Sequence, residues 1–537
     1  MKRLTIIAIA ICLSLSMALP AMAMDVDFSG YFWSRGQTNT KRDLQETNST
    51  DAYAYMKFRL KTDFKINDNI KLTTQFDALD NKRFGEDDTV TATTTTMPLS
   101  TGGFQSTTTV NEKSNIDWDV AYATVKTPIG GFLFGRWYGT AWGTDFADSN
   151  QDPGDKITWV VPIDNWLFAL QYKKIQEADE GTLVADQDWD KYYAVVNYKS
   201  ENWRAGLLGS FYNLKNFVTP AQVDITKRYL IPAAATTGNP ITDPLTQATA
   251  MGNLSAVEAA KVPGYMAGGM TLAQATTFAF NETLKQASVG GEANTQIFVI
   301  NPYFMGTFGG LSVQAEVAYG TGTSKYTEID MSAIAAGFGQ PGDYTHYTRP
   351  DVDAEGIGAF LDVVYDFGPV WLNGGYAFAS GDNDPYDNKT ESFAYLEPSG
   401  DFHKLFILTG AGENGGLDQN LGGGAGNLAG GQAKELPNYG YKIWFAGFGW
   451  DAMENLSLDL LVGSSEADKV PNGYDKKHGT EYDFTATWKP IDNLQLRGVV
   501  AHLDTGDIFK YVERYGAAPL TEVVDNTTYF LEARVDF

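Results

Sequence analysis

Charged residues alternate with apolar residues in several segments of this 537-residue chain, and their spacing predicts a wetted wall that is either a generic mixed-charge lining, the favoured interpretation, or a basic zone that admits anionic solutes. Lys57, Arg59 and Lys61 fall on one face of an extended segment, because successive side chains of a strand point to opposite sides. Fixed charges on a wall that contacts water discriminate between ions and charged solutes. The candidate pore-lining residues are Lys57, Arg59, Lys61, Arg136, Arg204, Arg497, Glu532 and Arg534.

The chain contains no arrangement typical of an enzyme active site. An outer-membrane lipase is the enzyme class considered, but no histidine is accompanied by a serine in a nucleophile context. Three of the four histidines fall in predicted loops or at a loop edge. The histidines are His346, His403, His478 and His502. We therefore expect no catalysis and no catalytic residues.

One acidic segment has the composition of a weak calcium site. The run from Gly381 to Asp387 offers carboxylate and amide oxygens, which are the ligands that Ca²⁺ prefers. It lacks the fixed spacing of an EF-hand and its final glutamate, so a solvated acidic loop is the favoured interpretation. We expect no cofactor and no resident metal.

The N-terminus has the pattern of a secretory signal peptide. Lys2 and Arg3 precede an apolar run that is shorter than the roughly 20 residues of a spanning helix. An A-x-A pattern then ends at Ala23. We expect residues 1–23 to be removed near Ala23. The only cysteine, Cys12, leaves with them, which excludes disulfides and thiolate metal sites from residues 24–537.

The charge balance excludes nucleic acid as a partner. The chain has 40 basic and 66 acidic residues, a net charge of −26, and no basic run that would attract phosphates. No apolar stretch of spanning length follows residue 23. A membrane protein of this kind has to be a closed barrel, since only helices and barrels satisfy every backbone group in lipid. The 13% aromatic content and 55 glycines favour the barrel over a soluble β-protein.

The last nine residues, 529–537, favour the same conclusion. One face of this segment is apolar and the other carries charges, with Glu532, Arg534 and Asp536 among them. A terminal amphipathic strand that ends on an aromatic residue, here Phe537, is similar to the closing strand of bacterial outer-membrane barrels. Its apolar face would contact lipid and its charged face a wet lumen.

Strand-like segments recur along the whole chain. Connections after even-numbered segments are short, two of them reading Pro-Ile-Asp-Asn, whereas most others are long and polar. This asymmetry predicts an all-β, transmembrane antiparallel β-barrel of about 18 strands (16–20 possible), with short periplasmic turns and long extracellular loops at 82–114, 215–293 and 381–437. The segments are 26–37, 51–64, 70–81, 115–127, 131–139, 157–161, 166–176, 189–199, 203–214, 294–305, 311–321, 353–366, 370–380, 438–450, 456–465, 479–488, 494–502 and 526–537.

Two further features concern the rims of this barrel. Tryptophans near the strand ends predict aromatic belts at the membrane interfaces. They are Trp118, Trp137, Trp166, Trp203, Trp450 and Trp488. Loop 215–293 is too long for a plain connection, and it could either fold into the barrel or cap it from outside.

Short motifs resemble those of a known family. The segments 375–382 and 393–403, and the pair formed by 121–125 with Phe134-Gly-Arg136, are similar to the alginate-export type of outer-membrane porin. The resemblance implies an eighteen-stranded barrel with a basic, loop-gated channel for an anionic polysaccharide.

The leading hypothesis is an outer-membrane porin of a Gram-negative bacterium, giving passive or weakly selective diffusion of small hydrophilic solutes. The alternative is a specific channel for an anionic oligosaccharide or carboxylate. A third hypothesis is the barrel sheath of an electron-transfer complex; any haem would come from a partner, because no Cys-x-x-Cys-His motif is present. Outer-membrane lipid is the expected surrounding, and a homotrimer is expected by analogy with other porins.

Overall fold

The computed structural model describes residues 25–41, 44, 46, 50–84, 92–98, 104–110, 116–138, 142–146, 154–177, 188–217, 293–326, 328–329, 347–348, 351–382, 389–393, 404–410, 439–511 and 521–537. The structural statements below concern these residues. The expected signal peptide and residues 218–292 of the predicted loop 215–293 lie outside them, as does most of the 381–387 run.

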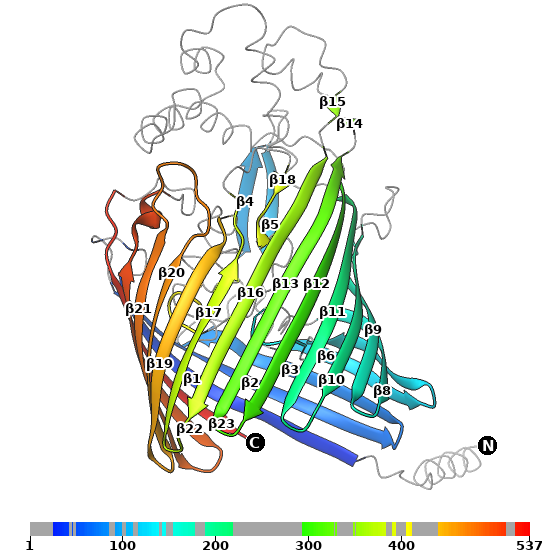
Figure 1. Ribbon diagram of the computed structural model, residues 1–537, viewed down its shortest axis with the longest axis horizontal. Coiled ribbons are helices and arrows are strands. Elements are labelled where there is room, and N and C mark those ends of the chain that lie inside the picture. The colour runs from blue at the N-terminus through cyan, green and yellow to red at the C-terminus, as the bar shows by residue number, and fades with distance from the viewer. Residues whose placement is uncertain are drawn as a thin grey trace, which may run out of the picture.

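Eighteen long strands form one antiparallel sheet that closes on itself (Figure 1). The number equals the sequence prediction, and the strand predicted at 157–161 extends over residues 154–163. The strands are β1 Asp25–Thr40, β2 Asp51–Asn67, β3 Ile70–Arg83, β6 Ile116–Thr127, β7 Gly130–Trp137, β8 Gly154–Ile163, β9 Trp166–Gln176, β10 Trp189–Lys199, β11 Trp203–Phe217, β12 Ala293–Phe308, β13 Leu311–Tyr326, β16 Val352–Asp366, β17 Val370–Ala379, β19 Tyr441–Met453, β20 Leu456–Glu466, β21 Lys477–Ile491, β22 Leu494–Thr505 and β23 Asn526–Asp536.

The barrel closes where β23 pairs with β1, in a register that runs from Tyr31 opposite Asp536 to Thr40 opposite Thr527. Beyond this ladder the N–H of Gly30 donates to the carbonyl of Phe537 at 2.9 Å, and the N–H of Phe537 donates back at 3.0 Å. The C-terminal residue is therefore part of the closure. No strand of the barrel is left with an unpaired edge along its length.

Short turns gather on the rim where the C-terminus lies (Figure 1). In the two Pro-Ile-Asp-Asn turns, Asp164 and Asn493 have φ angles of 50° and 65°. Asp and Asn tolerate this left-handed conformation better than other side chains with a Cβ. The local sequence thus explains why the chain reverses at these two points.

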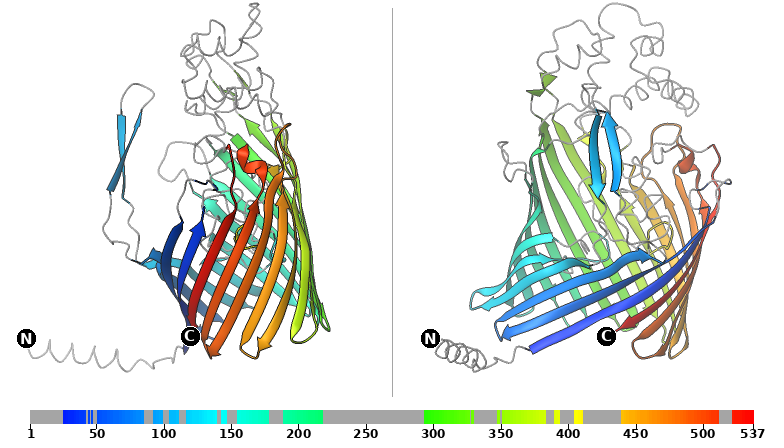
Figure 2. Two further views of the ribbon diagram at one scale, coloured as in Figure 1. Left: turned by 90° about the vertical axis from the view of Figure 1, so that its left-hand side faces the viewer. Right: turned by 180° about the vertical axis from the view of Figure 1, so that it is seen from behind.

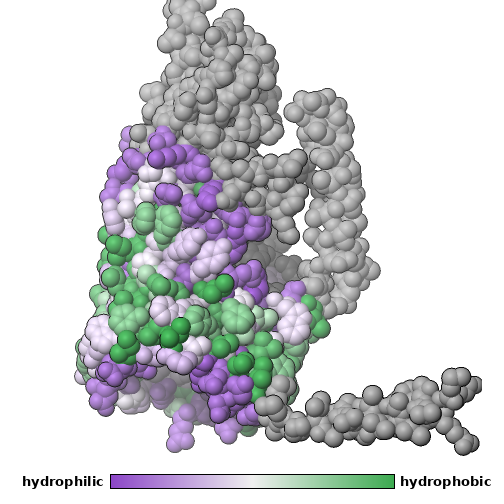
Figure 3. All heavy atoms as spheres, turned by 90° about the vertical axis from the view of Figure 1, so that its right-hand side faces the viewer, coloured by the Kyte–Doolittle hydropathy of each residue, from purple (hydrophilic) through white to green (hydrophobic). Residues whose placement is uncertain are grey.

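The two faces of the barrel differ in polarity. Large apolar side chains such as Leu170, Ile300 and Leu531 are exposed on the outside. On the side seen in Figure 3, hydrophobic side chains form a band with hydrophilic side chains above and below it. Charged residues such as Arg35, Glu316 and Glu481 are buried on the inside. This is the reverse of a soluble barrel, which has an apolar interior.

A β-bulge in β6 changes which residues of the next strands face inward. The β3–β6 register shifts between Gln75 and Phe76, and the bulge at Asp119 places Asp119 and Val120 on the same, inner side. Trp137 of β7 is consequently buried inside, and its neighbour Arg136 is turned to the outer surface. The predicted places of these two residues, in the lumen for Arg136 and in the outer belt for Trp137, are corrected accordingly.

Four of the other predicted belt tryptophans, Trp118, Trp166, Trp450 and Trp488, are exposed on the outer surface. Trp203 is half-buried, and its ring packs against those of Tyr198 and Phe304.

Short elements accompany the barrel. β4 Ala92–Pro98 and β5 Phe104–Val110 pair as a hairpin within the predicted 82–114 loop (Figure 2). β14 Glu328–Ile329 pairs with β15 Tyr347–Thr348, and β18 Lys389–Thr390 adds a short parallel partner to β16. A 3-10 helix, η3 Asp507–Lys510, follows β22. Within the described part of the chain, no helix is long and apolar enough to cross a membrane.

Substitution at the closing seam tests its energetics. Arg35 of β1 donates to Glu532 of β23 at 2.5 Å, and both side chains are nearly fully buried. Glu532→Ala leaves the Arg35 charge buried, so we expect the free energy of unfolding to fall by about 3–5 kcal/mol. Urea unfolding of the purified protein, followed by tryptophan fluorescence, measures the change.

The matched control for this test is the double variant Arg35→Met, Glu532→Leu. It removes both charges, and we expect it to recover most of the lost stability. A loss below about 1 kcal/mol for Glu532→Ala would show that the ion pair does not support the seam.

Candidate functional site

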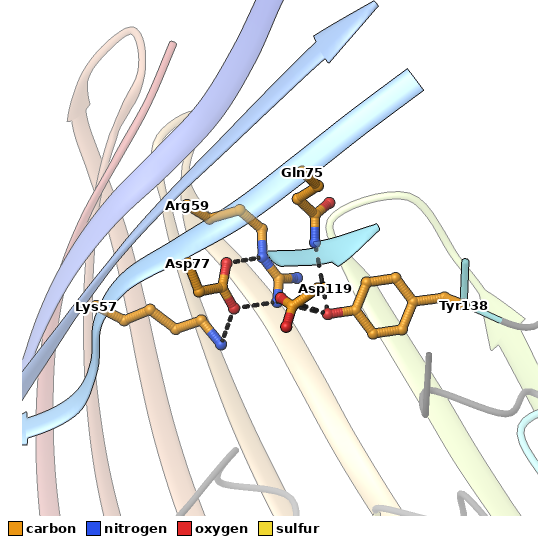
Figure 4. A network of polar contacts seen from close by, with 6 residues as sticks. All are labelled: Lys57, Arg59, Gln75, Asp77, Asp119 and Tyr138. Atoms are coloured by element: carbon orange, nitrogen blue, oxygen red, sulfur yellow. Dashed lines mark hydrogen bonds and ion pairs between the residues drawn. The ribbon is translucent and has the colours of Figure 1, made fainter. Parts of the chain in front are cut away.

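A cluster of charged side chains lines one side of the barrel interior (Figure 4). The guanidinium of Arg59 makes a two-point contact with Asp77, from Nε to Oδ1 and from Nη2 to Oδ2, each 2.7 Å long. Lys57 Nζ lies 2.6 Å from Asp77 Oδ2. Bidentate arginine–carboxylate pairs are directional as well as strong, so Asp77 fixes the orientation of Arg59.

Asp119 and Tyr138 complete this cluster. The Tyr138 hydroxyl donates to Asp119 Oδ2 at 2.8 Å and accepts from Arg59 Nη2 at 3.0 Å. Burial raises the pKa of Tyr138, which follows the last residue of β7, so its hydroxyl keeps the proton that it donates. The two cations of the cluster face two carboxylates, and its formal charge is balanced.

A second cluster lies along the closing seam. Glu532 accepts from Arg35 and lies 3.6 Å from the Nε of Arg497 on β22, so two guanidinium groups share one carboxylate. The guanidinium of Arg35 also lies 4.0 Å from the centre of the Trp33 ring. Arginine over an aromatic face is stabilised by the ring quadrupole. This part of the wall therefore brings two guanidinium groups and one carboxylate together.

Arg534 is positioned separately on the same strand as Glu532. Its Nε donates to Asp536 at 2.9 Å, and its guanidinium lies 4.3 Å from the centre of the Tyr31 ring. Aromatic and charged side chains therefore alternate on this part of the inner wall.

Three lysines stand side by side on the inner faces of β8, β9 and β10. Lys173 is directly opposite Lys156 on one side and Lys191 on the other. The ammonium of Lys156 lies 5.5 Å from the Trp137 ring, and that of Lys191 lies 4.0 Å from the Tyr212 ring. In the strand order of the barrel this row is opposite β21, whose inner face holds Glu481 and Asp483.

The segment Trp142–Phe146, which follows β7, reaches the opposite wall of the barrel. The backbone N–H and the hydroxyl of Thr144 both donate to Glu316 Oε2 on β13 at 2.6 Å. Asn301 of β12 donates to the other oxygen of the same carboxylate at 2.9 Å. Because β7 and β13 are not neighbours in the sheet, this contact carries the segment across the lumen.

Further contacts hold the same segment in place. Arg204 Nη2 donates to the carbonyl of Gly143 at 3.4 Å. The Phe146 ring stacks on Phe360 with centroids 5.7 Å apart, and on Phe393 at 6.1 Å. A charged contact and a stacked aromatic layer together fix the segment inside the barrel.

A second segment, Lys404–Gly410, is held inside by acidic side chains of the wall. The backbone N–H groups of Ile407 and Leu408 donate to the two oxygens of Glu481 at 2.5 and 2.6 Å, and that of Phe406 donates to Asp483 at 3.0 Å. Carboxylates in a concave set of backbone N–H groups form an anion nest. Lys404 adds an ion pair of 2.5 Å to Asp362 on β16. Both inward segments thus narrow the interior.

The sequence predictions for the wall can now be placed. Arg136 is outside, where its Nη1 lies 3.3 Å from Asp155. The sequence analysis did not identify the row formed by Lys156, Lys173 and Lys191. Lys173 lies in the predicted strand 166–176, whose period-2 alternation was a signal that could have indicated its inward position. The remaining candidates are on the inner face: Lys57, Arg59, Lys61, Arg204, Arg497, Glu532 and Arg534.

Comparisons with known proteins yield structural likeness only. No protein-family model matches the chain, and no curated protein matches it in sequence. The fold is similar to the crystal structure of OccK8 (OprE) of Pseudomonas aeruginosa, with 10% sequence identity, a TM-score of 0.44, and coverage of 96% of this chain and 98% of that chain. It is similar to the crystal structure of OccAB1 of Acinetobacter baumannii, with 10% sequence identity, a TM-score of 0.43, and coverage of 96% of this chain and 97% of that chain. It is also similar to OmpT of Vibrio cholerae in its trimer form, with 9% sequence identity, a TM-score of 0.35, and coverage of 96% of this chain and 99% of that chain.

Removing the anion nest tests whether it holds the second segment. In the variant Glu481→Gln, Asp483→Asn, the N–H groups of residues 406–408 lose their charged acceptors, at a cost of about 1–3 kcal/mol each. We expect amide hydrogen exchange in 404–410 to become at least tenfold faster, and trypsin to cleave after Lys404.

Asp459→Asn is the matched control, because Asp459 is an inward carboxylate of the neighbouring strand β20 that makes no hydrogen bond to the described part of the segment. In the Asp459→Asn variant, amide hydrogen exchange in residues 404–410 should stay at the wild-type rate. Unchanged protection of 404–410 in the double variant would contradict the anchoring role of the two carboxylates.

Proposed function

We propose that the chain is an outer-membrane porin through which small hydrophilic solutes diffuse. The observation that carries this proposal is the inverted polarity of a closed barrel. An apolar exterior is favourable only against lipid, and a wall of charged residues is favourable only against water. A bacterial outer membrane is the location expected for such a barrel.

The interior is narrowed rather than open. Trp142–Phe146 and Lys404–Gly410 both cross into the lumen and are anchored by carboxylates of the wall. Segments held inside a barrel of this size reduce the free cross-section and bring charged groups close to a passing solute. We infer a passage that selects by size and by charge, and we keep the homotrimer as a prediction.

A second candidate function is a specific channel for an anionic carboxylate or oligosaccharide. The gathering of cationic side chains at Arg35 and Arg497, together with the lysine row on β8–β10, favours anions. The resemblance of short motifs to alginate-export type porins suggests an anionic polysaccharide or its fragments as the solute. The balanced cluster at Arg59 favours neither sign of charge.

Liposome swelling tests the porin proposal. Liposomes containing the purified protein, placed in isosmotic sugar solutions, should swell at a rate that falls steeply as the sugar grows from a pentose to a trisaccharide. A narrowed aqueous pore predicts this order. Swelling no faster than that of protein-free liposomes, with the protein folded, would contradict the proposal.

Arginine substitutions separate the two candidate functions. Arg497→Gln removes one of the two guanidinium groups at the seam and leaves the Arg35–Glu532 pair intact. If anions are selected, the anion-to-cation permeability ratio, from reversal potentials in a salt gradient, should fall by roughly two- to fivefold, equivalent to about 0.4–1 kcal/mol.

Arg136→Gln is the matched control, since Arg136 is an arginine on the outer surface. It should leave the permeability ratio unchanged. An Arg497→Gln channel with the wild-type ratio would eliminate the specific anion channel and leave the weakly selective porin.

A further inference from the structure

Three potential metal ligands meet on the outer surface where β22 and β23 approach the long-loop rim. His502 and Asp504 are two residues apart on β22, so they point to the same side. Asp525 immediately precedes β23, and its place in the register is opposite Asp504. One donor atom from each of the three side chains lies within 4.8 Å of the other two.

The contacts around these residues orient them. The Nδ1 of His502 lies 2.8 Å from the Thr527 hydroxyl, and its Nε2 lies 3.2 Å from Asp504 Oδ1. When Nδ1–H donates to Thr527, Nε2 carries a lone pair directed at the carboxylates. Asp525 accepts from the backbone N–H of Thr505 at 3.0 Å, so the second carboxylate is fixed as well.

The distance between His502 and Asp504 fits a tetrahedral ion. Zinc binds nitrogen and oxygen ligands at about 2.0–2.1 Å in tetrahedral sites, which puts neighbouring ligand atoms about 3.3 Å apart. The 3.2 Å between His502 Nε2 and Asp504 Oδ1 matches this value. In the tautomer that carries its proton on Nδ1, the Nε2 lone pair faces this carboxylate oxygen and is available to a cation; in the other tautomer, Nε2–H donates to Asp504.

The charges of the site also favour a cation. Asp504 and Asp525 bring two negative charges together, and among the described residues neither forms an ion pair with a lysine or an arginine. A neutral imidazole with two carboxylates leaves a net charge of −2, which a divalent ion balances.

We propose that His502, Asp504 and Asp525 bind a divalent transition-metal ion, with Zn²⁺ as the reference ion. An imidazole ligand disfavours Ca²⁺ and Mg²⁺, which prefer oxygen donors only. The protein supplies three ligands, and water completes the coordination. Because His502 and Asp504 lie on β22 and Asp525 immediately precedes β23, the ion would tie the end of β22 to the start of β23. This inference is independent of the proposed transport function.

Zinc binding to the full-length, untagged protein in detergent tests the proposal. Equilibrium dialysis against Zn²⁺ should give one ion per folded chain. His502→Ala and Asp525→Asn each remove a ligand and should weaken binding at least tenfold. Thr527→Val removes the hydroxyl that orients the imidazole and should weaken binding about tenfold.

Asp451→Asn, at an exposed carboxylate on the opposite rim, is the control and should bind Zn²⁺ as the wild type does. The mobility shift of the folded barrel on unheated gels shows that each variant is folded. The proposal would be overturned if the wild type bound fewer than about 0.2 Zn²⁺ ions per folded chain, or if Zn²⁺ binding persisted in both His502→Ala and Asp525→Asn. Displacement of Zn²⁺ by an equal concentration of Ca²⁺ would overturn the role of the imidazole.

Discussion

The pairing of β23 with β1 is the constraint on which the rest of the structure depends. A sheet with two free edges would expose backbone N–H and C=O groups that lipid cannot satisfy. Closure by the Gly30–Phe537 pair and the ladder above it removes both edges. Once the sheet is closed, every strand has one face inside and one outside, and the period-2 pattern assigns each side chain to water or to lipid. The buried Arg35–Glu532 pair crosses this same seam.

The interior shows what the many acidic residues of the wall do. Glu316, Glu481 and Asp483 hold backbone N–H groups of the two inward segments. Asp77 orients Arg59 and Lys57. These carboxylates act first as anchors for loops and for cations. Cationic side chains gather at the seam and along the β8–β10 lysine row.

Local patterns were sufficient to predict the strands from the sequence. Alternation over ten or more residues and turn residues such as those of Pro-Ile-Asp-Asn act within a short stretch of chain. The strand number therefore agrees with the structure, and all strand boundaries but one lie within three residues of their predicted positions. The bulge at Asp119 could not be predicted, because one extra residue in a pleated strand leaves no distinct composition. It reversed the faces predicted for Arg136 and Trp137.

The inward segments were beyond prediction for a different reason. Thr144 and Glu316 are 172 residues apart, and Ile407 and Glu481 are 74 apart. Such contacts depend on the shape of the closed barrel rather than on the pattern of either segment. The sequence left open whether loop 215–293 folds into the barrel or caps it, and residues 218–292 of that loop lie outside the described residues. Two shorter segments narrow the lumen. The resemblance to alginate-export type porins implied a loop-gated channel without indicating which residues anchor the loops.

The central claim is that the closed barrel encloses a continuous path for water and ions across a membrane. Single-channel recording of the purified protein in a planar lipid bilayer tests it most directly. The structure predicts discrete conductance steps of uniform size that scale with salt concentration and persist at low voltage. A folded, inserted protein that produces no steps above the bilayer baseline would contradict the account.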